Sequence, residues 1–382
     1  MDATIQRIAC DVARQCHAEA LDLLRELARI PAPSHHEERR ARFVCDWMAA
    51  NGLSDTFIDE ANNVICPLGD DGTRDLVVFA AHTDVVFPDE DELPLHEEDG
   101  RLFAPGVGDD TANLVSLLLA ARHLARNPSI MPDGLGVLIV ANSCEEGLGN
   151  LKGTKALFLA YGHRIRRYYS FDLYLPSYID VAVGSCRWRI TVSTQGGHSL
   201  KDFGRANAIE RLCAVVQALY AIELPTDAVC TMNVGTIGGG TTVNAIASQA
   251  DCLFEFRSTS AAALEHLQGC LEWTIAKFQS DEVRITVESL GVRPASAPSG
   301  DAQRRMSRLT YDVLQAITGE EPVCEPASTD ANVPLSMGIP ANTVGAVRGA
   351  LLHTRDEWVD GKSLKEGLAV ILCLMLSQNQ LA

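Results

Sequence analysis

The 382-residue chain has few basic residues, no long apolar run and no Cys-x-x-Cys pair. Lysine and arginine number 32 against 50 aspartate and glutamate residues, so the formal net charge is −18. Nucleic acids and anionic membrane surfaces both require clustered cations, and the longest basic stretch is only residues 163–167. No uncharged apolar run approaches the roughly 20 residues of a membrane span. Residues 1–7 lack the basic-then-apolar pattern of a signal peptide. We therefore expect no nucleic-acid partner and no membrane partner.

The 12 cysteines are scattered along the chain. Cys213 and Cys373 lie in apolar helical patterns, where a free thiol packs like a small hydrophobic side chain. This usage favours a reduced, cytoplasmic protein over a disulfide framework.

What is present is a globular composition, with 47% hydrophobic and 21% charged residues. A chain of this length usually forms about two domains. Short apolar runs separated by helical patterns, such as residues 115–124, predict buried strands of a mostly parallel sheet between helices. The expected strands are residues 76–81, 137–141, 168–171 and, more weakly, 343–346.

The middle of the chain has a different pattern, in which apolar and polar residues alternate as in half-exposed strands. The sequence therefore predicts an inserted α+β domain at residues 186–294, with a β-α-β-β-α-β, ferredoxin-like order. Residues 1–185 and 295–382 would together form a discontinuous α/β domain. The strands expected in the insert are residues 187–193, 252–258 and 283–287, and the helices are residues 206–222 and 261–278.

Potential metal ligands follow several of the strand-like runs, and in open α/β sheets ligands collect at the carboxyl ends of strands. Two divalent ions about 3.5–4 Å apart need several carboxylates and a few imidazoles. That mixture suits zinc, with cobalt or manganese as alternatives. The candidate groups are His82-Thr83-Asp84, Asp109-Asp110, Glu145-Glu146, Asp172 and His353.

Each group alone also has a purely structural explanation. An aspartate pair before a helix caps it, a glutamate pair is usually solvated, and a lone histidine commonly lies at the surface or in the core. Cys144 next to the glutamate pair is a conceivable nucleophile, but no histidine base is evident near it, so a buried packing thiol is the preferred interpretation. The joint order of the groups favours a metal site.

That order resembles the M20 family of dinuclear zinc peptidases and amidohydrolases over nearly the whole chain. Residues 146–153 and 203–209 are most similar to its tripeptide aminopeptidase (peptidase T) branch. The motifs that carry the resemblance are His82-Thr83-Asp84, Gly106-Val107-Gly108-Asp109-Asp110, Glu145-Glu146-Gly147, Asp172, Gly197-His198-Ser199, Asn244-Ala245-Ile246, Arg257, Gly291-Val292-Arg293-Pro294, Ser328-Thr329-Asp330 and His353.

The resemblance implies two metal ions, zinc before cobalt or manganese. His82 and Asp172 would bind one ion, and Glu146 and His353 would bind the other. Asp109 would bridge both ions together with a water or hydroxide.

The resemblance also implies the catalytic roles. Glu145 would be the general base that takes a proton from the water and then protonates the leaving amine. Asp84 would steady His82. The peptide bond between Asp109 and Asp110 is expected to be cis.

Residues 186–294 resemble the lid and dimerisation domain of the family, which implies a homodimer. His198 would polarise the substrate carbonyl, reaching across to the partner subunit's site. Asn244 and Arg257 would hold the substrate backbone or its carboxylate. Outside the family context, His198 is simply a residue beside two glycines in a turn, and Arg257 is a charge on a strand face.

We therefore expect a metal-dependent hydrolase that cleaves an amide bond in small peptides. In the family, an aspartate at the position of Asp172 accompanies aminopeptidases and dipeptidases, whereas a glutamate accompanies carboxypeptidases and deacylases. The resemblance therefore favours an aminopeptidase. An N-acyl-amino-acid deacylase or a carboxypeptidase on the same scaffold is the alternative. A non-catalytic peptide-binding relative is a third hypothesis, and the retained Glu145 argues against it.

Overall fold

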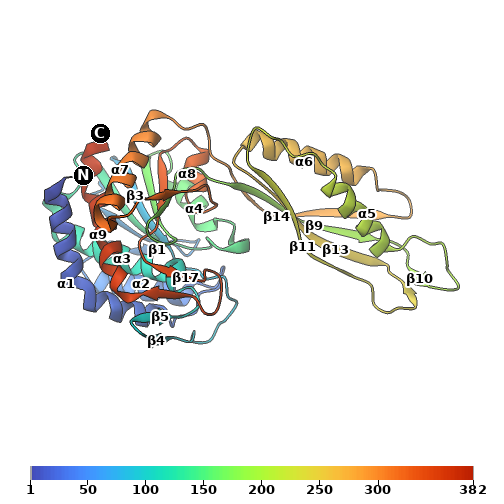
Figure 1. Cartoon of the computed structure of the whole chain (residues 1–382), viewed down its shortest axis with the longest axis horizontal. Coiled ribbons are helices and arrows are strands. Elements are labelled where there is room, and N and C mark those ends of the chain that lie inside the picture. Colours follow the sequence, from blue (N-terminus) through green and yellow to red (C-terminus); the bar gives the residue numbers. More distant parts are fainter. Residues whose placement is uncertain (1, 382) are drawn as a thin grey trace. The chain divides into compact units, whose positions relative to one another are not determined.

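A computed structural model describes residues 2–381 of the chain. Val183–Ala297 form one compact unit, and the remaining described residues form the other. The inserted unit is slightly longer than residues 186–294 because its first long strand begins at Gly184 and Ala295 joins its core. Figure 1 labels helices and strands of both units.

The larger unit is built on an eight-stranded sheet. Its four central strands all run parallel to their neighbours in this group, and antiparallel pairs occur toward both edges. This confirms the predicted mostly parallel α/β sheet. From edge to edge the strands are β1 (Phe57–Ile58), β2 (Val64–Leu68), β6 (Leu135–Asn142), β3 (Asp75–His82), β7 (Ile165–Phe171), β16 (Ala341–Val344), β8 (Ser177–Ile179) and β15 (Val323–Cys324).

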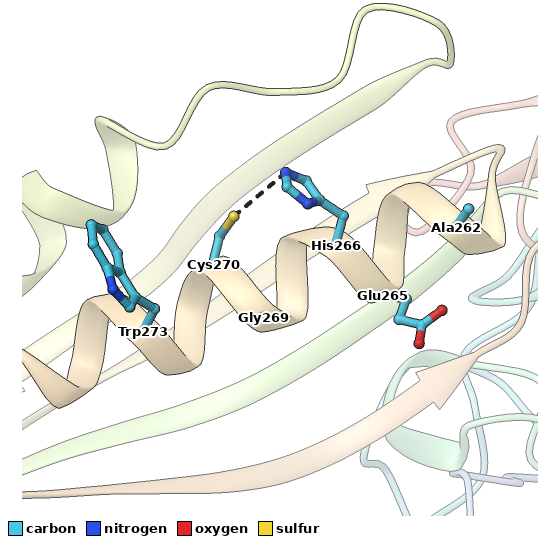
Figure 2. Close-up of a pocket in the computed structure, with 6 residues that line it drawn as sticks. All are labelled: Ala262, Glu265, His266, Gly269, Cys270 and Trp273. Carbon is cyan, nitrogen blue, oxygen red and sulfur yellow. Dashed lines mark hydrogen bonds between the residues drawn. The ribbon is translucent and has the colours of Figure 1, made fainter.

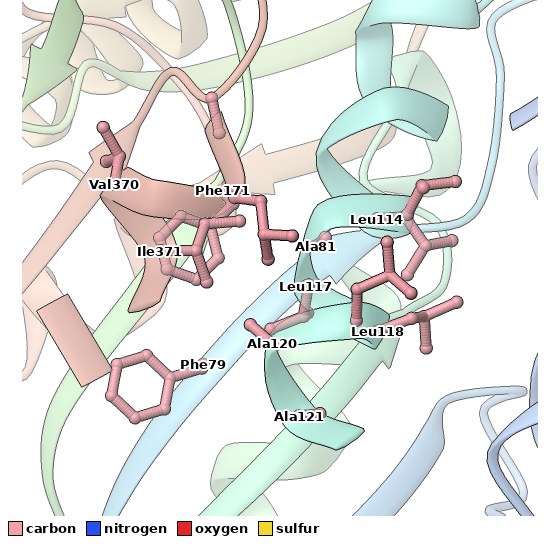
Figure 3. Packing of buried hydrophobic residues seen from close by; sticks show 14 of the residues in the cluster. Phe79, Ala81, Leu114, Leu117, Leu118, Ala120, Ala121, Phe171, Val370 and Ile371 are labelled. Carbon is pink, nitrogen blue, oxygen red and sulfur yellow. The ribbon is translucent and has the colours of Figure 1, made fainter. Parts of the chain in front are cut away.

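Helices cover both faces of this sheet, which is why β3 reads as a continuous apolar run. Phe79 and Ala81 point into one core and Val78 and Ala80 into the other. Figure 3 shows Phe79 and Phe171 packed beside α3 and α9. The first core is formed with α1 (Ala3–Leu27), α2 (Glu38–Ala50), α3 (Ala112–Arg126), α7 (Asp301–Thr318) and α9 (Leu364–Leu376), and the second with α4 (Lys152–Tyr161) and α8 (Asn332–Ser336).

A small four-stranded sheet also belongs to the larger unit. It is antiparallel, and its strands are only two or three residues long. The connection between its first two strands carries His353. In sheet order the strands are β17 (Gly349–Ala350), β18 (Trp358–Asp360), β5 (Arg101–Phe103) and β4 (His96–Glu98).

The inserted unit has the predicted β-α-β-β-α-β order, with a four-stranded antiparallel sheet. Both helices pack on one face, against Trp188, Phe254 and Phe256. In sheet order the strands are β11 (Cys230–Gly239), β13 (Gln249–Ser258), β9 (Gly184–Ser193) and β14 (Arg284–Arg293); the helices are α5 (Ala208–Tyr220) and α6 (Ala261–Ala276), and a short pair is formed by β10 (Gly197–His198) and β12 (Ala245–Ile246).

The outer side of α6 carries an open hollow of about 480 Å³ (Figure 2). Cys270 Sγ lies 3.6 Å from His266 Nε2 there, beside the exposed Trp273. None of the predicted site residues lines this hollow.

All 12 cysteines are free. Cys373 is buried as predicted, whereas the prediction for Cys213 was wrong, because this thiol lies on the exposed side of α5. Within the described residues, no helix combines the length and the apolar composition needed to cross a bilayer.

Candidate metal centre

The turns that follow neighbouring parallel strands position most of the predicted ligands. β3 ends at His82, and Asp172 directly follows β7. Glu145 and Glu146 lie three and four residues beyond the end of β6. Because β6, β3 and β7 are adjacent and parallel, their carboxyl ends meet at one edge of the sheet.

Asp109 lies at the middle of the cluster. It belongs to a wide turn, Val107–Thr111, and the peptide bond to Asp110 is cis as predicted. Asp109 Oδ1 is 2.8 Å from His82 Nε2, and its Oδ2 is 3.0 Å from His353 Nε2. The two oxygens of one carboxylate therefore face two different imidazoles.

The five predicted metal ligands form two groups that share Asp109. One group is His82, Asp109 and Asp172, and the other is Asp109, Glu146 and His353. Within each group the potential ligand atoms lie within 4.8 Å of one another. His353 Nε2 is also 3.3 Å from Glu146 Oε1. The structure thus brings together residues that are up to 271 positions apart in the sequence (His82 to His353, 353 − 82).

The ring of His82 is oriented through its other nitrogen. Nδ1 lies 3.0 Å from the backbone oxygen of Asp84 and 3.4 Å from its carboxylate Oδ1. A proton on Nδ1 that is donated to Asp84 leaves the Nε2 lone pair directed at the cluster, which is the arrangement typical of metal-binding histidines.

The Asp84 carboxylate has a second task that the sequence did not indicate. Its Oδ1 accepts a hydrogen bond from the Glu145 backbone N–H at 2.9 Å, and its Oδ2 accepts one from the Glu146 N–H at 2.9 Å. Ser34 Oγ donates to Oδ2 at 2.7 Å. Asp84 therefore orients the glutamate pair as well as His82.

Glu145 lies beside the cluster without belonging to either group around Asp109. It forms a third group with His82 and Glu146, and it is only 5% exposed. A carboxylate in this place is suited to accept a proton from a water held between the two groups.

Burial and mutual repulsion perturb the acids of the cluster. Burial, reinforced by the charge of Asp109, raises the pKa of Glu146 to about 9 and holds the pKa of Asp172 well above its ordinary value. Hydrogen bonds with Asp109 and Glu146 raise the pKa of His353 to about 10. For Asp109, burial favours the neutral form, but hydrogen bonds from His353 and His82 outweigh it and hold the pKa below its usual range.

The donor set fits two divalent cations. Three buried carboxylates and two imidazoles converge, and Asp172 Oδ1 is buried without a hydrogen-bond partner among the described residues. A buried acceptor of this kind is costly unless a cation or a donor reaches it. Mixed carboxylate and imidazole ligands are those that zinc, manganese and cobalt accept.

The surroundings of Cys144 correct one expectation. His35 Nδ1 lies 3.4 Å from Cys144 Sγ, so the expectation that no histidine is near this thiol was wrong. The residues are 109 positions apart, which is why the sequence did not reveal the contact. Cys144 Sγ donates to Glu37 Oε1 at 3.1 Å, and burial raises the pKa of the thiol. These contacts favour the protonated packing thiol over a nucleophile.

The predicted substrate-binding residues lie in the inserted unit, and only two of them are neighbours. His198 on β10 is exposed, and the N–H of Ser199 donates to the Asn244 backbone oxygen at 3.0 Å. β13 begins at Gln249, five residues after Asn244, and Arg257 lies eight residues further along this strand. At about 3.3 Å per residue, Arg257 is about 26 Å from Gln249.

Two buried charged residues near the cluster carry no sequence signal. Arg40 on α2 donates to the Thr83 backbone oxygen at 3.0 Å and to Thr111 Oγ1 at 3.2 Å, so it ties together the segments that hold His82 and Asp109. Glu357 is the second such residue, and its carboxylate accepts hydrogen bonds from the N–H groups of Gly106 and Asp109. In the sequence both resemble ordinary surface charges.

Comparison with known proteins is consistent with this geometry. The model of peptidase family M20/M25/M40 matches residues 78–377. The succinyl-diaminopimelate desuccinylase of Corynebacterium glutamicum is 25% identical over 371 residues, covering 91% of this chain and 94% of the relative. The acetylornithine deacetylase of Myxococcus xanthus is 25% identical over 332 residues, covering 84% of each chain.

Solved structures show the same fold. The aminopeptidase PepT of Bacillus cereus superimposes with a TM-score of 0.71 at 20% identity, covering 94% of this chain and 98% of that one. The matched 94% of this chain includes most of both units.

Proposed function

Since the chain belongs to peptidase family M20/M25/M40, we propose that it is an aminopeptidase that cleaves small peptides with two divalent metal ions. Hydrolysis of an amide bond follows from the family and its relatives. The preference for a peptide with a free amino terminus, and zinc as the bound metal, are the finer parts of the proposal. An aspartate at the position of Asp172 supports the aminopeptidase assignment.

One observation carries the proposal: Asp109 faces both histidines while Glu145 lies beside the same cluster. A module that only binds peptides needs neither a shared carboxylate nor a spare buried acid. When bound, two divalent ions polarise the amide carbonyl and lower the pKa of a shared water.

The protein's own groups would handle the proton. Glu145 accepts a proton from the attacking water and donates it to the nitrogen of the departing amine, so that the carboxylate is regenerated after each turnover. Asp84 fixes the backbone of Glu145 and Glu146, which limits the freedom of both carboxylates.

The inserted unit would supply substrate contacts, with His198 stabilising the oxyanion and Asn244 and Arg257 holding the substrate. Arg257 pairs with Ser185 at one end of the β9–β13 pair, whereas His198 lies in the β10–β12 pair, which follows the opposite end of β9. A small peptide is too short to contact both residues of a single unit. This separation supports a homodimer in which His198 of one copy serves the metal site of the other.

A substrate panel tests the proposal. Protein stripped with a chelator and reloaded with zinc or cobalt is assayed on tripeptides with a free amino terminus and on the same peptides after N-acetylation. We expect cleavage of the free tripeptides only, and complete loss of activity without metal. Cleavage of the blocked peptides alone would refute the aminopeptidase assignment.

A second candidate is an N-acyl-amino-acid deacylase, because the two curated relatives described above are a desuccinylase and a deacetylase. Both reactions break an amide bond and need the same metal cluster. N-succinyl and N-acetyl derivatives of basic amino acids in the same panel separate the two candidates, because the acyl group replaces the free amine that an aminopeptidase requires.

A further inference from the structure

Glu357, which follows His353 by four residues, is a buried carboxylate that accepts four hydrogen bonds. The residue as a whole is only 1% exposed. Oε1 accepts hydrogen bonds from the N–H of Gly108 at 3.2 Å, the N–H of Asp109 at 2.9 Å and the hydroxyl of Tyr174 at 2.7 Å. Oε2 accepts one from the N–H of Gly106 at 2.8 Å.

These contacts join three segments that carry predicted metal ligands. Two of the N–H donors are those of Asp109, the shared member of both groups, and of Gly108 next to it. Tyr174 follows Asp172 by two residues. Glu357 itself closes the loop that contains His353. Movement of this one carboxylate would therefore displace three ligands that the cluster needs at fixed spacing.

The surroundings of the carboxylate are closely packed. A Cβ atom added to Gly108 would lie 2.6 Å from Tyr174 Cε1 and 2.8 Å from Glu357 Oε1. A Cβ atom added to Gly349 would lie 2.6 Å from the same Tyr174 carbon. Glycine at these two positions allows the backbone to approach the carboxylate and the ring closely.

Only a carboxylate satisfies this set of partners. The three backbone N–H groups are donors, and the tyrosine hydroxyl also donates, so both oxygens of Glu357 must accept. A glutamine side chain of the same size would turn an NH₂ group toward one or more of these donors. Leaving such buried donors unpaired is unfavourable.

We propose that Glu357 is a positioning residue that sets the spacing of Asp109, Asp172 and His353 and thereby the affinity of the cluster for its two cations. Glu357 belongs to none of the three groups of potential ligands among the described residues. The proposal rests on the proposed dinuclear site. Partners that orient metal ligands commonly change metal affinity by about 10–100-fold when they are removed.

Two variants and two matched controls test this role. Glu357→Gln replaces one of the two acceptor oxygens by an NH₂ group, and Tyr174→Phe removes a single hydroxyl. The controls are Glu321→Gln and Tyr311→Phe, because the Tyr311 hydroxyl donates to Glu321 Oε1 at the same 2.7 Å distance on the exposed surface. Cobalt affinity is measured by competition with a chelator, together with thermal midpoints of the metal-free proteins and kcat and KM at saturating cobalt.

We expect Glu357→Gln to weaken cobalt binding by about 10–100-fold, and Tyr174→Phe by a smaller factor. Saturating cobalt should restore most of kcat while KM remains near the wild-type value. Both control variants should bind cobalt like the wild type. This pattern separates a positioning role from a purely structural one, which would lower the thermal midpoint alone.

Cobalt affinity within about twofold of wild type in the Glu357 variant would overturn the proposal, since the expected change is at least about tenfold. If that variant does not fold, unchanged affinity in Tyr174→Phe overturns it instead. Absence of cobalt binding by the wild type would refute the proposed dinuclear site itself, which is a different outcome.

Discussion

At the scale of single residues, two adjacent acids are assigned different tasks. Glu145→Gln should lower kcat by about 10²–10⁴-fold, because proton transfer loses its acceptor. The bound metal should stay unchanged, since Glu145 lies outside both groups that share Asp109. Glu146→Gln should instead reduce the metal content. Metal analysis beside steady-state kinetics checks both variants, and equal metal loss in the two would contradict the division of tasks.

The raised pKa of Glu146 predicts how metal-free protein responds to pH. Burial raises this pKa from an ordinary 4.5 to about 9, so over that interval the native state keeps a proton that the unfolded chain has released. Stability must therefore fall as the pH rises through the interval. Thermal midpoints of chelator-treated protein should decrease with pH, and less steeply in Glu146→Gln. Parallel curves for the two proteins would count against this assignment.

How much of the site the sequence could predict depends on how each residue acts. His82 ends one apolar strand, Asp172 and Glu146 follow two others, and the structure brings the three residues together. The burial of Glu357 and the contact between Cys144 and His35 could not be predicted, because the contacting residues lie more than 100 positions apart and no local pattern marks them. A buried glutamate and a solvated one are identical in the sequence, because burial depends on residues that are distant along the chain.

At the scale of elements, two helical glycines should respond in opposite ways to the same change. In α9, a Cβ atom on Gly367 would lie 1.5 Å from the Ala346 backbone oxygen, so Gly367→Ala should destabilise the fold by about 1–3 kcal/mol or more. In α6, a Cβ atom on Gly269 meets nothing within 4 Å, so Gly269→Ala should stabilise by about 0.4–1 kcal/mol. Thermal unfolding checks the pair, and a common sign of the two shifts would contradict the described packing.

The elements themselves were predictable where burial was extreme. β3 and β6 are enclosed by helices on both faces, so their apolar runs identify them directly. β11 was not identified, because its residues are largely exposed and its sequence is rich in glycine and threonine. The two- and three-residue strands beside His353 are too short for any periodicity to appear.

At the scale of the whole molecule, a dimer that shares active sites predicts complementation. His198→Ala and Glu145→Gln homodimers should each be nearly inactive. After subunit exchange, a mixed dimer pairs an intact metal site with an intact His198, so an equal mixture should recover about a quarter of wild-type activity in a two-fold symmetric assembly. The mixture is assayed before and after exchange. No recovery, with exchange verified, would contradict the action of His198 across subunits.

The metal content of the purified chain tests the central claim most directly. Asp109 faces both histidines, so two ions should bind per wild-type chain, and Asp109→Asn should weaken the binding of both. Metal stoichiometry and affinity measured on the two proteins decide the question. Two ions in the wild type, with both weakened in the variant, is the predicted result. One ion or none in the wild type, or a variant that still binds two ions with wild-type affinity, would contradict a shared dinuclear centre.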